Sequence, residues 1–321
     1  SVVIHNTEWP KWVDAMDPDP REDLADIEST GRGRKLTRPR PGHADLVGAM
    51  KYAYDDVRDA LERASARETA ARVVVGTMAK ALLAEVGVSI VSHVTGIGGV
   101  ETPEDAPRPG PEDLERIDAD LVRCADDVTS KQMQERIDEA YAHNDTVGGL
   151  IEVIAYGLPP GLGSHVHWDR KLDTRLAAAC LSVQAMKGVE FGDGFKLAAT
   201  PGSKAHDEIE YASDGGYRRL TDHAGGLEAG MTTGQPLRLR VAMKPISSLT
   251  RPLRTVDMET HEPAEAITQR SDTCAVPRAG VVLEAVVAYE LADALLEKTG
   301  GDTVDEVVRN LRAYLDVIAQ R

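Results

Sequence analysis

The sequence predicts an α+β fold, because segments with the apolar spacing of a helix alternate with segments that have the period of a strand. Apolar residues recur at helical spacing in residues 44–61, and residues 280–298 form a long apolar run of helical length. Residues 237–243 alternate as Leu-Arg-Leu-Arg-Val-Ala-Met, which is typical of a strand with one buried face. A chain of 321 residues is long enough to bury the core of one large domain or two ordinary ones.

The remaining elements follow in chain order. The sequence predicts a helix to about residue 86 after a Ser65-x-x-Glu68 capping box, strands over 89–96 and 150–156, a helix over 172–187, and a last helix after a Thr303-x-x-Glu306 capping box. Residues 101–146 are charged and punctuated by proline, which predicts a solvated helical insertion within a single domain. The opening Ser-Val-Val-Ile resembles the end of a strand, so we expect either a trimmed terminus or an upstream part of the fold that this chain lacks.

Composition is that of an ordinary globular protein, with 42% hydrophobic and 28% charged residues. The net charge of −16 disfavours nucleic acid and anionic membranes as partners of the whole chain, and no apolar run reaches membrane-spanning length. The three cysteines are scattered without CxxC spacing, which indicates reduced thiols and a cytoplasmic protein rather than disulfides or a zinc site.

A basic island interrupts this acidic chain. Residues 31–40 contain no acid and five cations, which are Arg32, Arg34, Lys35, Arg38 and Arg40. A nuclear-localisation or RNA-binding tract has a similar composition in a short window. Interleaved glycine and proline and the absence of stacking aromatic residues favour a small phosphorylated ligand instead.

The island leads into a turn that presents one histidine. Two prolines stiffen the backbone on either side of Arg40, and Gly42 allows a sharp turn before His43. Asp45 then falls in the first turn of the predicted helix, where the helix dipole favours a negative charge. Cations beside a group that titrates near neutrality predict an anionic substrate and a proton transfer, although an ordinary surface turn explains this motif equally well.

Four further segments have functional interpretations. Arginines on both sides of the Ser65 cap predict an anion site as readily as a plain helix start. Glycine-rich residues 200–235 are either a flexible loop or, as we favour, a backbone wrapped around a ligand.

For His165 and His167 we favour a surface location over a metal site, because no third ligand is near in sequence. Asp272 lies beside an arginine and before a long helix, which predicts an ionised carboxylate of fixed orientation.

Together, these segments identify a family. Five motifs resemble those of chorismate synthase and occur in the order of that family, from about residue 6 to the last helix. They are Arg38-Pro39-Arg40-Pro41-Gly42-His43-Ala44-Asp45, Glu62-Arg63-Ala64-Ser65-Ala66-Arg67-Glu68-Thr69, Gly225-Gly226-Leu227-Glu228, Met243-Lys244-Pro245-Ile246 and Arg270-Ser271-Asp272.

The resemblance implies a β-α-β sandwich and a homotetramer. It implies a carbon–oxygen lyase of the shikimate pathway, which converts 5-enolpyruvylshikimate-3-phosphate into chorismate and phosphate by a 1,4-elimination. The reaction requires reduced FMN, with NADPH as the indirect reductant and an external flavin reductase as an expected partner.

The resemblance also implies roles for individual residues. His43 matches a histidine that exchanges a proton with the reduced flavin, and Asp272 matches an aspartate near flavin N5 that takes part in removing the ring proton. Arg40 and Arg67 match arginines that hold the substrate. The implied FMN-binding residues are Arg63, Ala64, Ser65, Gln184, Ala185, Ala229, Lys244, Pro245, Ile246, Ser247, Ser248 and Arg270.

The front of the chain departs from the family pattern. The family opens with a Gly-Glu-Ser-His-Gly motif and an arginine-rich loop, and neither is found in this sequence. We therefore expect the chain to lack the N-terminal segment of the family. The alternative function is a catalytically silent FMN-binding or assembly-only relative.

Overall fold

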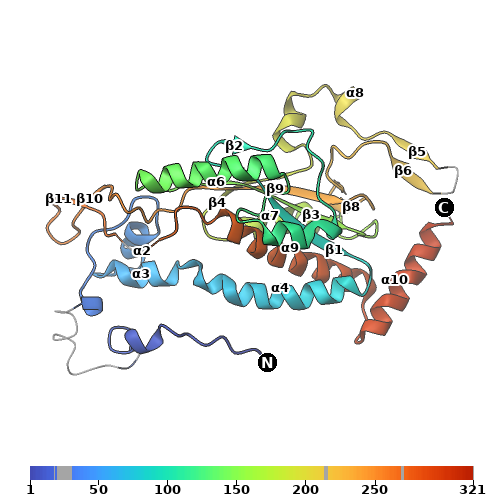
Figure 1. Cartoon of the computed structure of the whole chain (residues 1–321). Helices are drawn as coiled ribbons and strands as arrows, with labels where there is room; N and C mark the ends of the chain where they lie inside the picture. Colours follow the sequence, from blue (N-terminus) through green and yellow to red (C-terminus); the bar gives the residue numbers. More distant parts are fainter. Residues whose placement is uncertain (18, 20–30, 213–215, 269–270, 321) are drawn as a thin grey trace. The chain divides into compact units, whose positions relative to one another are not determined.

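The computed structural model describes residues 1–17, 19, 31–212, 216–268 and 271–320 (Figure 1). The chain divides into two compact units, which are described separately. Unit 1 comprises Ser1–Arg67, His143–Thr146 and Ser247–Thr273. Unit 2 comprises Glu68–Ala142, Val147–Ile246 and Cys274–Arg321.

Unit 2 is built on a five-stranded antiparallel sheet with the strand order β2-β1-β3-β9-β4. Its strands are β1 (Ser89–Ile97), β2 (Val100–Glu101), β3 (Gly149–Tyr156), β4 (Met186–Phe191) and β9 (Leu237–Met243). Two short ribbons, β5 (Ile209–Tyr211) with β6 (Tyr217–Arg219) and β7 (Leu227–Glu228) with β8 (Met231–Thr232), belong to the same unit. The predicted strands at 89–96, 150–156 and 237–243 are therefore confirmed.

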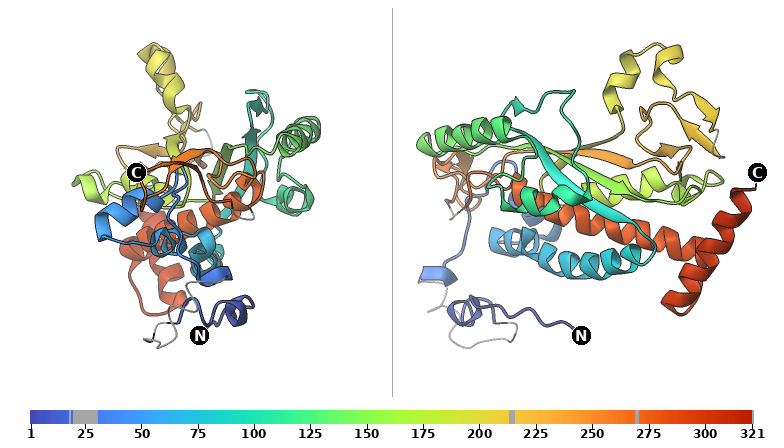
Figure 2. Two further views of the ribbon diagram at one scale, coloured as in Figure 1. Left: turned by 90° about the vertical axis from the view of Figure 1, so that its left-hand side faces the viewer. Right: turned by 45° about the vertical axis from the view of Figure 1, so that its right-hand side comes forward.

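One face of the sheet is covered by helices. Helix α9 (Val276–Thr299) packs against β1 and β3, α7 (Leu172–Leu181) packs against α9 and β4, and α4 (Thr69–Ala84) lies along α9 (Figures 1 and 2). The core lies between the sheet and α9, where Ile151, Leu239 and Leu283 are buried. Helices α4 and α9 approach closely because Gly76 has no side chain: a Cβ there would lie 2.3 Å from the Cβ of Ala285.

The remaining helices of unit 2 are α5 (Leu114–Ala119), α6 (Asp127–Ala142), α8 (Gly202–Ala205) and α10 (Val304–Ile318). The Thr303 capping box of α10 is confirmed, because Thr303 and Glu306 exchange side-chain and backbone hydrogen bonds. Residues 101–146 are not wholly solvated, since Ile117 and Met133 are fully buried and α6 packs against β1 and β2.

Unit 1 contains α2 (Asp45–Tyr52), α3 (Val57–Arg63) and the ribbon of β10 (Arg254–Val256) with β11 (Pro263–Glu265). The prediction of one helix over residues 44–61 is wrong. The chain leaves the helix at Ala53, whose φ is 56°, and Asp56 caps α3 by accepting a hydrogen bond from Arg58 N. Helical apolar spacing continues across this break, so periodicity did not reveal it.

Three other boundaries differ from the predictions. The helix predicted to reach residue 187 ends at Leu181, and the chain turns through Ala185, whose φ is 68°, into β4. Helix α4 begins at Thr69, and Ser65 Oγ accepts from Arg67 N beside a 3-10 turn, so Ser65 does not cap α4. Residues 1–6 form no strand.

The α+β class is confirmed. Helices packed on an antiparallel sheet make up the fold, as this prediction requires.

Candidate functional site

The basic turn of unit 1 folds around a buried carboxylate. Asp45 is fully buried in the first turn of α2, and Arg40 is only 5% exposed. Asp45 Oδ2 accepts hydrogen bonds from the backbone N and the Nε of Arg40, both at 3.0 Å. The Nη1 of Arg40 donates to Ser248 Oγ at 2.5 Å. The turn thus holds its arginine rigidly rather than presenting it on a flexible loop.

His43 lies at the edge of this pair. Its Nδ1 is 2.5 Å from Asp45 Oδ1 and 3.1 Å from the Nη2 of Arg40, and a fifth of the side chain is exposed. The predicted placement of His43 directly before a helix, with Asp45 in the first turn, is confirmed. Cation, carboxylate and imidazole form one network, which we call the Arg40–His43–Asp45 network.

Electrostatics keep Asp45 ionised. Burial alone would raise the pKa of Asp45, but hydrogen bonds from His43 and Arg40 and the charge of Arg40 outweigh it and lower the pKa to about 2. An ionised carboxylate beside a guanidinium gives the network a fixed charge arrangement at neutral pH.

Acid should therefore remove part of the stability of this protein. Because the pKa of Asp45 is lower in the folded state than its ordinary value of 3.8, its contribution is complete above about pH 4 and is lost as the pH falls through about 2. The shift corresponds to about 2 kcal/mol of unfolding free energy. Urea unfolding between pH 5 and pH 2.5 should show the difference between the unchanged protein and Asp45→Asn shrinking as the pH falls. A constant difference would contradict this.

The other predicted residues of unit 1 lie in several places. Arg63 is exposed in the last turn of α3, Ala64 and Ser65 are half-buried after it, and the Arg67 side chain is 80% exposed and 3.9 Å from Glu62. Ser247 is half-buried and Asp272 is exposed. Arg270 lies outside the described residues. In unit 1, hydrogen bonds join Arg40 with two other predicted residues, His43 and Ser248.

A second group of predicted residues meets in unit 2. Gln184 Nε2 donates to Glu68 Oε1 at 2.7 Å, and the oxygen of Ala185 accepts from Lys244 N at 3.0 Å. Burial, with a smaller effect of nearby Lys187, lowers the pKa of Lys244. Gln184 Oε1 is buried and has no hydrogen-bond partner, so a buried acceptor is available at this point.

Two predicted neighbours complete this group. Pro245 is exposed and Ile246 packs against the hydrophobic core. Ala229, in contrast, lies in the turn between β7 and β8, where Gly230 O accepts from Leu172 N at the start of α7. Gln184 follows the other end of α7, and a helix of 10 residues is about 15 Å long. Within one chain, Ala229 is therefore not brought to Gln184.

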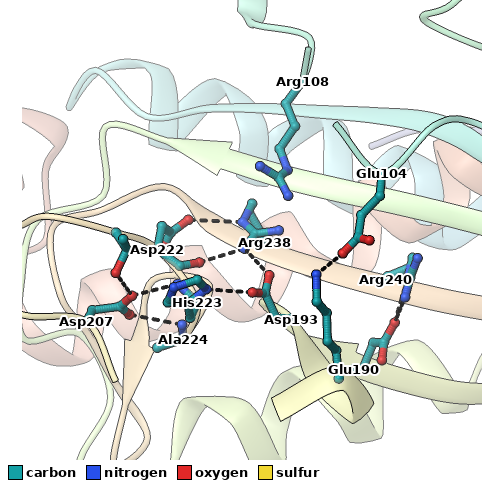
Figure 3. A network of polar contacts seen from close by, with 12 residues as sticks. Glu104, Arg108, Glu190, Asp193, Asp207, Asp222, His223, Ala224, Arg238 and Arg240 are labelled. Atoms are coloured by element: carbon teal, nitrogen blue, oxygen red, sulfur yellow. Dashed lines mark hydrogen bonds and ion pairs between the residues drawn. The ribbon is translucent and has the colours of Figure 1, made fainter. Parts of the chain in front are cut away.

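A polar cavity of about 310 Å³ in unit 2 was not predicted. Arg238, which is 5% exposed, is its central cation and contacts Asp222 at 3.0 Å and Asp193 at 3.2 Å (Figure 3). It also lies 3.7 Å from Glu152. His93, on β1, reaches Glu152 through Nε2 at 2.9 Å, while its buried Nδ1 has no partner. Because the cations of the cavity are paired with carboxylates, we assign this cluster a structural role.

The glycine-rich segment packs against the end of this cluster. Gly225 has a φ of 64°, and a Cβ there would lie 2.2 Å from Gly192 N. A Cβ on Gly226 would lie 2.4 Å from Pro236 O. The tight backbone predicted for residues 200–235 is thus present at these two glycines, but it surrounds neighbouring chain segments.

Removing the central cation should destabilise unit 2. Arg238→Met leaves Asp193 and Asp222 without their common partner and is expected to cost about 3–5 kcal/mol of unfolding free energy. Arg240→Met is the matched control two residues along β9, because its side chain is 42% exposed and it pairs with Glu190; it should cost less than about 1 kcal/mol. Equal effects in urea unfolding would contradict the assigned role.

Metal clusters, membrane spans and disulfides are not found in the described residues. The described residues contain no group of three or more possible metal ligands, and His165 and His167 are exposed. Among the same residues, no helix is both long enough and apolar enough to span a membrane. The three cysteines, which all lie in the described part of the chain, form no disulfide, and burial raises the pKa of Cys180 to about 12.

Comparison with known proteins gives a consistent result. The family model described as chorismate synthase matches residues 1–296. The chorismate synthase of Thermobifida fusca is 59% identical over all of this chain and 81% of its own length, and that of Frankia casuarinae is 61% identical over all of this chain and 82% of its own length. A crystal structure of chorismate synthase superposes with a TM-score of 0.74 at 42% identity, covering 87% of this chain and 77% of that one. The chain therefore belongs to the chorismate synthase family of carbon–oxygen lyases.

Proposed function

We propose that this protein converts 5-enolpyruvylshikimate-3-phosphate into chorismate and phosphate by a 1,4-elimination that requires reduced FMN. Family membership supports the reaction, and the observation that carries it is the Arg40–His43–Asp45 network. The network combines a rigid buried cation with a partly exposed imidazole, as an anionic substrate and a proton exchange require.

In this proposal, Arg40 and Arg67 hold anionic groups of the substrate. A guanidinium has five N–H donors, and the contacts of Arg40 with Asp45, Ser248 and His43 leave one N–H on Nη1 for a ligand. Arg67 is mostly exposed and therefore accessible. Fixed positive charge stabilises the negative charge that develops on the leaving phosphate most strongly where water is excluded.

The second group fits a flavin. Gln184 Oε1 is a buried acceptor without a partner, which suits the ring N–H of a flavin, and the cation of Lys244 suits an anionic cofactor. We propose that these two residues hold FMN together with Ala185, Pro245 and Ile246, and that Arg63, Ala64, Ser65, Ser247, Ser248 and Arg270 complete its site. Bound reduced FMN supplies the electron-rich ring that the elimination requires.

The protein contributes the proton exchanges. His43 would give up and take back a proton beside the bound cofactor, and Asp272, whose side chain is exposed, would take part in removing the ring proton of the substrate. NADPH acts as the reductant of FMN, through an external flavin reductase, and the active form is a homotetramer.

The experiment that tests the proposal supplies the enolpyruvyl phosphate and chemically reduced FMN under anaerobic conditions. We expect chorismate to form without added NADPH. Binding of FMN without any chorismate would instead indicate a catalytically silent relative.

A further inference from the structure

We propose that Asp45 is the positioning residue for proton exchange by His43, because it holds the neutral imidazole with its proton on Nδ1 and leaves Nε2 free to exchange a proton. This role rests on the proposed function of His43. Asp45 belongs to the basic turn, but it is not among the proposed catalytic, substrate-binding or FMN-binding residues.

Nδ1 of His43 has two polar neighbours, one a hydrogen-bond acceptor and the other a donor. Asp45 Oδ1, at 2.5 Å, can only accept a hydrogen bond when the carboxylate is ionised, whereas Arg40 Nη2, at 3.1 Å, can only donate one. Two lone pairs facing each other at 2.5 Å would repel, so a proton must lie between Nδ1 and Oδ1. The Arg40 nitrogen has its own acceptor in Asp45 Oδ1, at 3.3 Å. The geometry therefore selects the Nδ1–H form of the ring.

The carboxylate that makes this selection cannot turn away. Asp45 has no exposed surface and sits in the first turn of α2. Its Oδ2 is fixed by the backbone N and the Nε of Arg40, and its Oδ1 faces both His43 and Arg40. A ring bonded to such an anchor has a fixed plane as well as a fixed tautomer.

One carboxylate thus orients two groups of the proposed site. It holds the arginine that would bind substrate, and it directs the imidazole that would exchange the proton.

Asp45→Asn tests this arrangement, because the amide should reverse the tautomer. Its oxygen must face the two donors of Arg40 that Oδ2 now accepts, which turns its N–H₂ group towards Nδ1 of His43. Nδ1 then accepts a hydrogen bond, and the ring proton of neutral His43 moves to Nε2. We expect kcat for chorismate formation to fall roughly 10²-fold. KM should change less than about threefold, because the backbone N and the Nε of Arg40 keep their acceptor.

Nitrogen-15 NMR of histidine-labelled protein reads the tautomer directly, with the His43 signals identified from their loss in His43→Gln. We expect Nδ1–H in the unchanged protein and Nε2–H in Asp45→Asn. Asp59→Asn, which changes an exposed aspartate of α3 in the same unit, should leave the tautomer and kcat unchanged.

Three outcomes overturn the role of Asp45. One is an Nε2–H tautomer in the unchanged protein, a measurement that does not require any variant to fold. The second is an unchanged kcat in folded Asp45→Asn, and the third is an equal loss of kcat in Asp59→Asn. Absence of chorismate formation by the unchanged protein would overturn the proposed function instead, while the tautomer still decides whether Asp45 orients His43.

Discussion

His43→Ala is expected to lower kcat for chorismate formation about 10²- to 10⁴-fold, the usual contribution of a positioned proton-exchanging side chain. Binding of oxidised FMN should remain largely intact. The reason is local: the hydrogen bonds between Arg40 and Asp45 do not involve the imidazole, so the turn keeps its anchor when the ring is removed. Anaerobic assays with reduced FMN give kcat, and flavin fluorescence gives the dissociation constant.

The matched control is His165→Ala, which removes an exposed histidine from a loop of unit 2 and should leave both quantities unchanged. Loss of FMN binding together with normal turnover per bound flavin in His43→Ala would contradict the role given to His43.

Asp272→Asn is expected to reduce kcat by a similar factor, about 10²- to 10⁴-fold, because an amide cannot accept the proton that a carboxylate accepts. The side chain is exposed in unit 1 and the substitution preserves its size, so folding and the binding of substrate and FMN should be little affected. Steady-state kinetics and binding titrations separate these quantities. Near-normal turnover in Asp272→Asn would remove Asp272 from the proposed proton transfer.

The regular elements were predictable where the pattern was strong and local. Strand β9 has the bounds that its alternation predicts, and the apolar run within α9 was found from its composition and length. The break at Ala53 was missed because the Asp56 cap overrides a helical spacing that continues on both sides of it. The end of α7 was misplaced because Ala185 adopts a positive φ that alanine rarely takes.

The candidate site was likewise predictable only in its local features. The motif around His43 placed the histidine and the helix start correctly, because proline, glycine and aspartate act on the backbone next to them. The sequence did not reveal that Asp45 turns back to bind Arg40 and His43, since a first-turn aspartate usually serves only the helix. Arg238 contacts Asp222, Asp193 and Glu152, which precede it in the sequence by 16, 45 and 86 positions. These contacts depend on the folded sheet, and the alternating arginines of β9 were their only local signal.

The most direct test of the central claim is the stoichiometry of the anaerobic reaction with chemically reduced FMN and no NADPH. Because the proposed elimination consumes no net electrons, chorismate and phosphate should appear in equal amounts, and each should exceed the reduced FMN many times over. Product that never exceeds the reduced FMN, or no product from protein that binds FMN, would contradict the account.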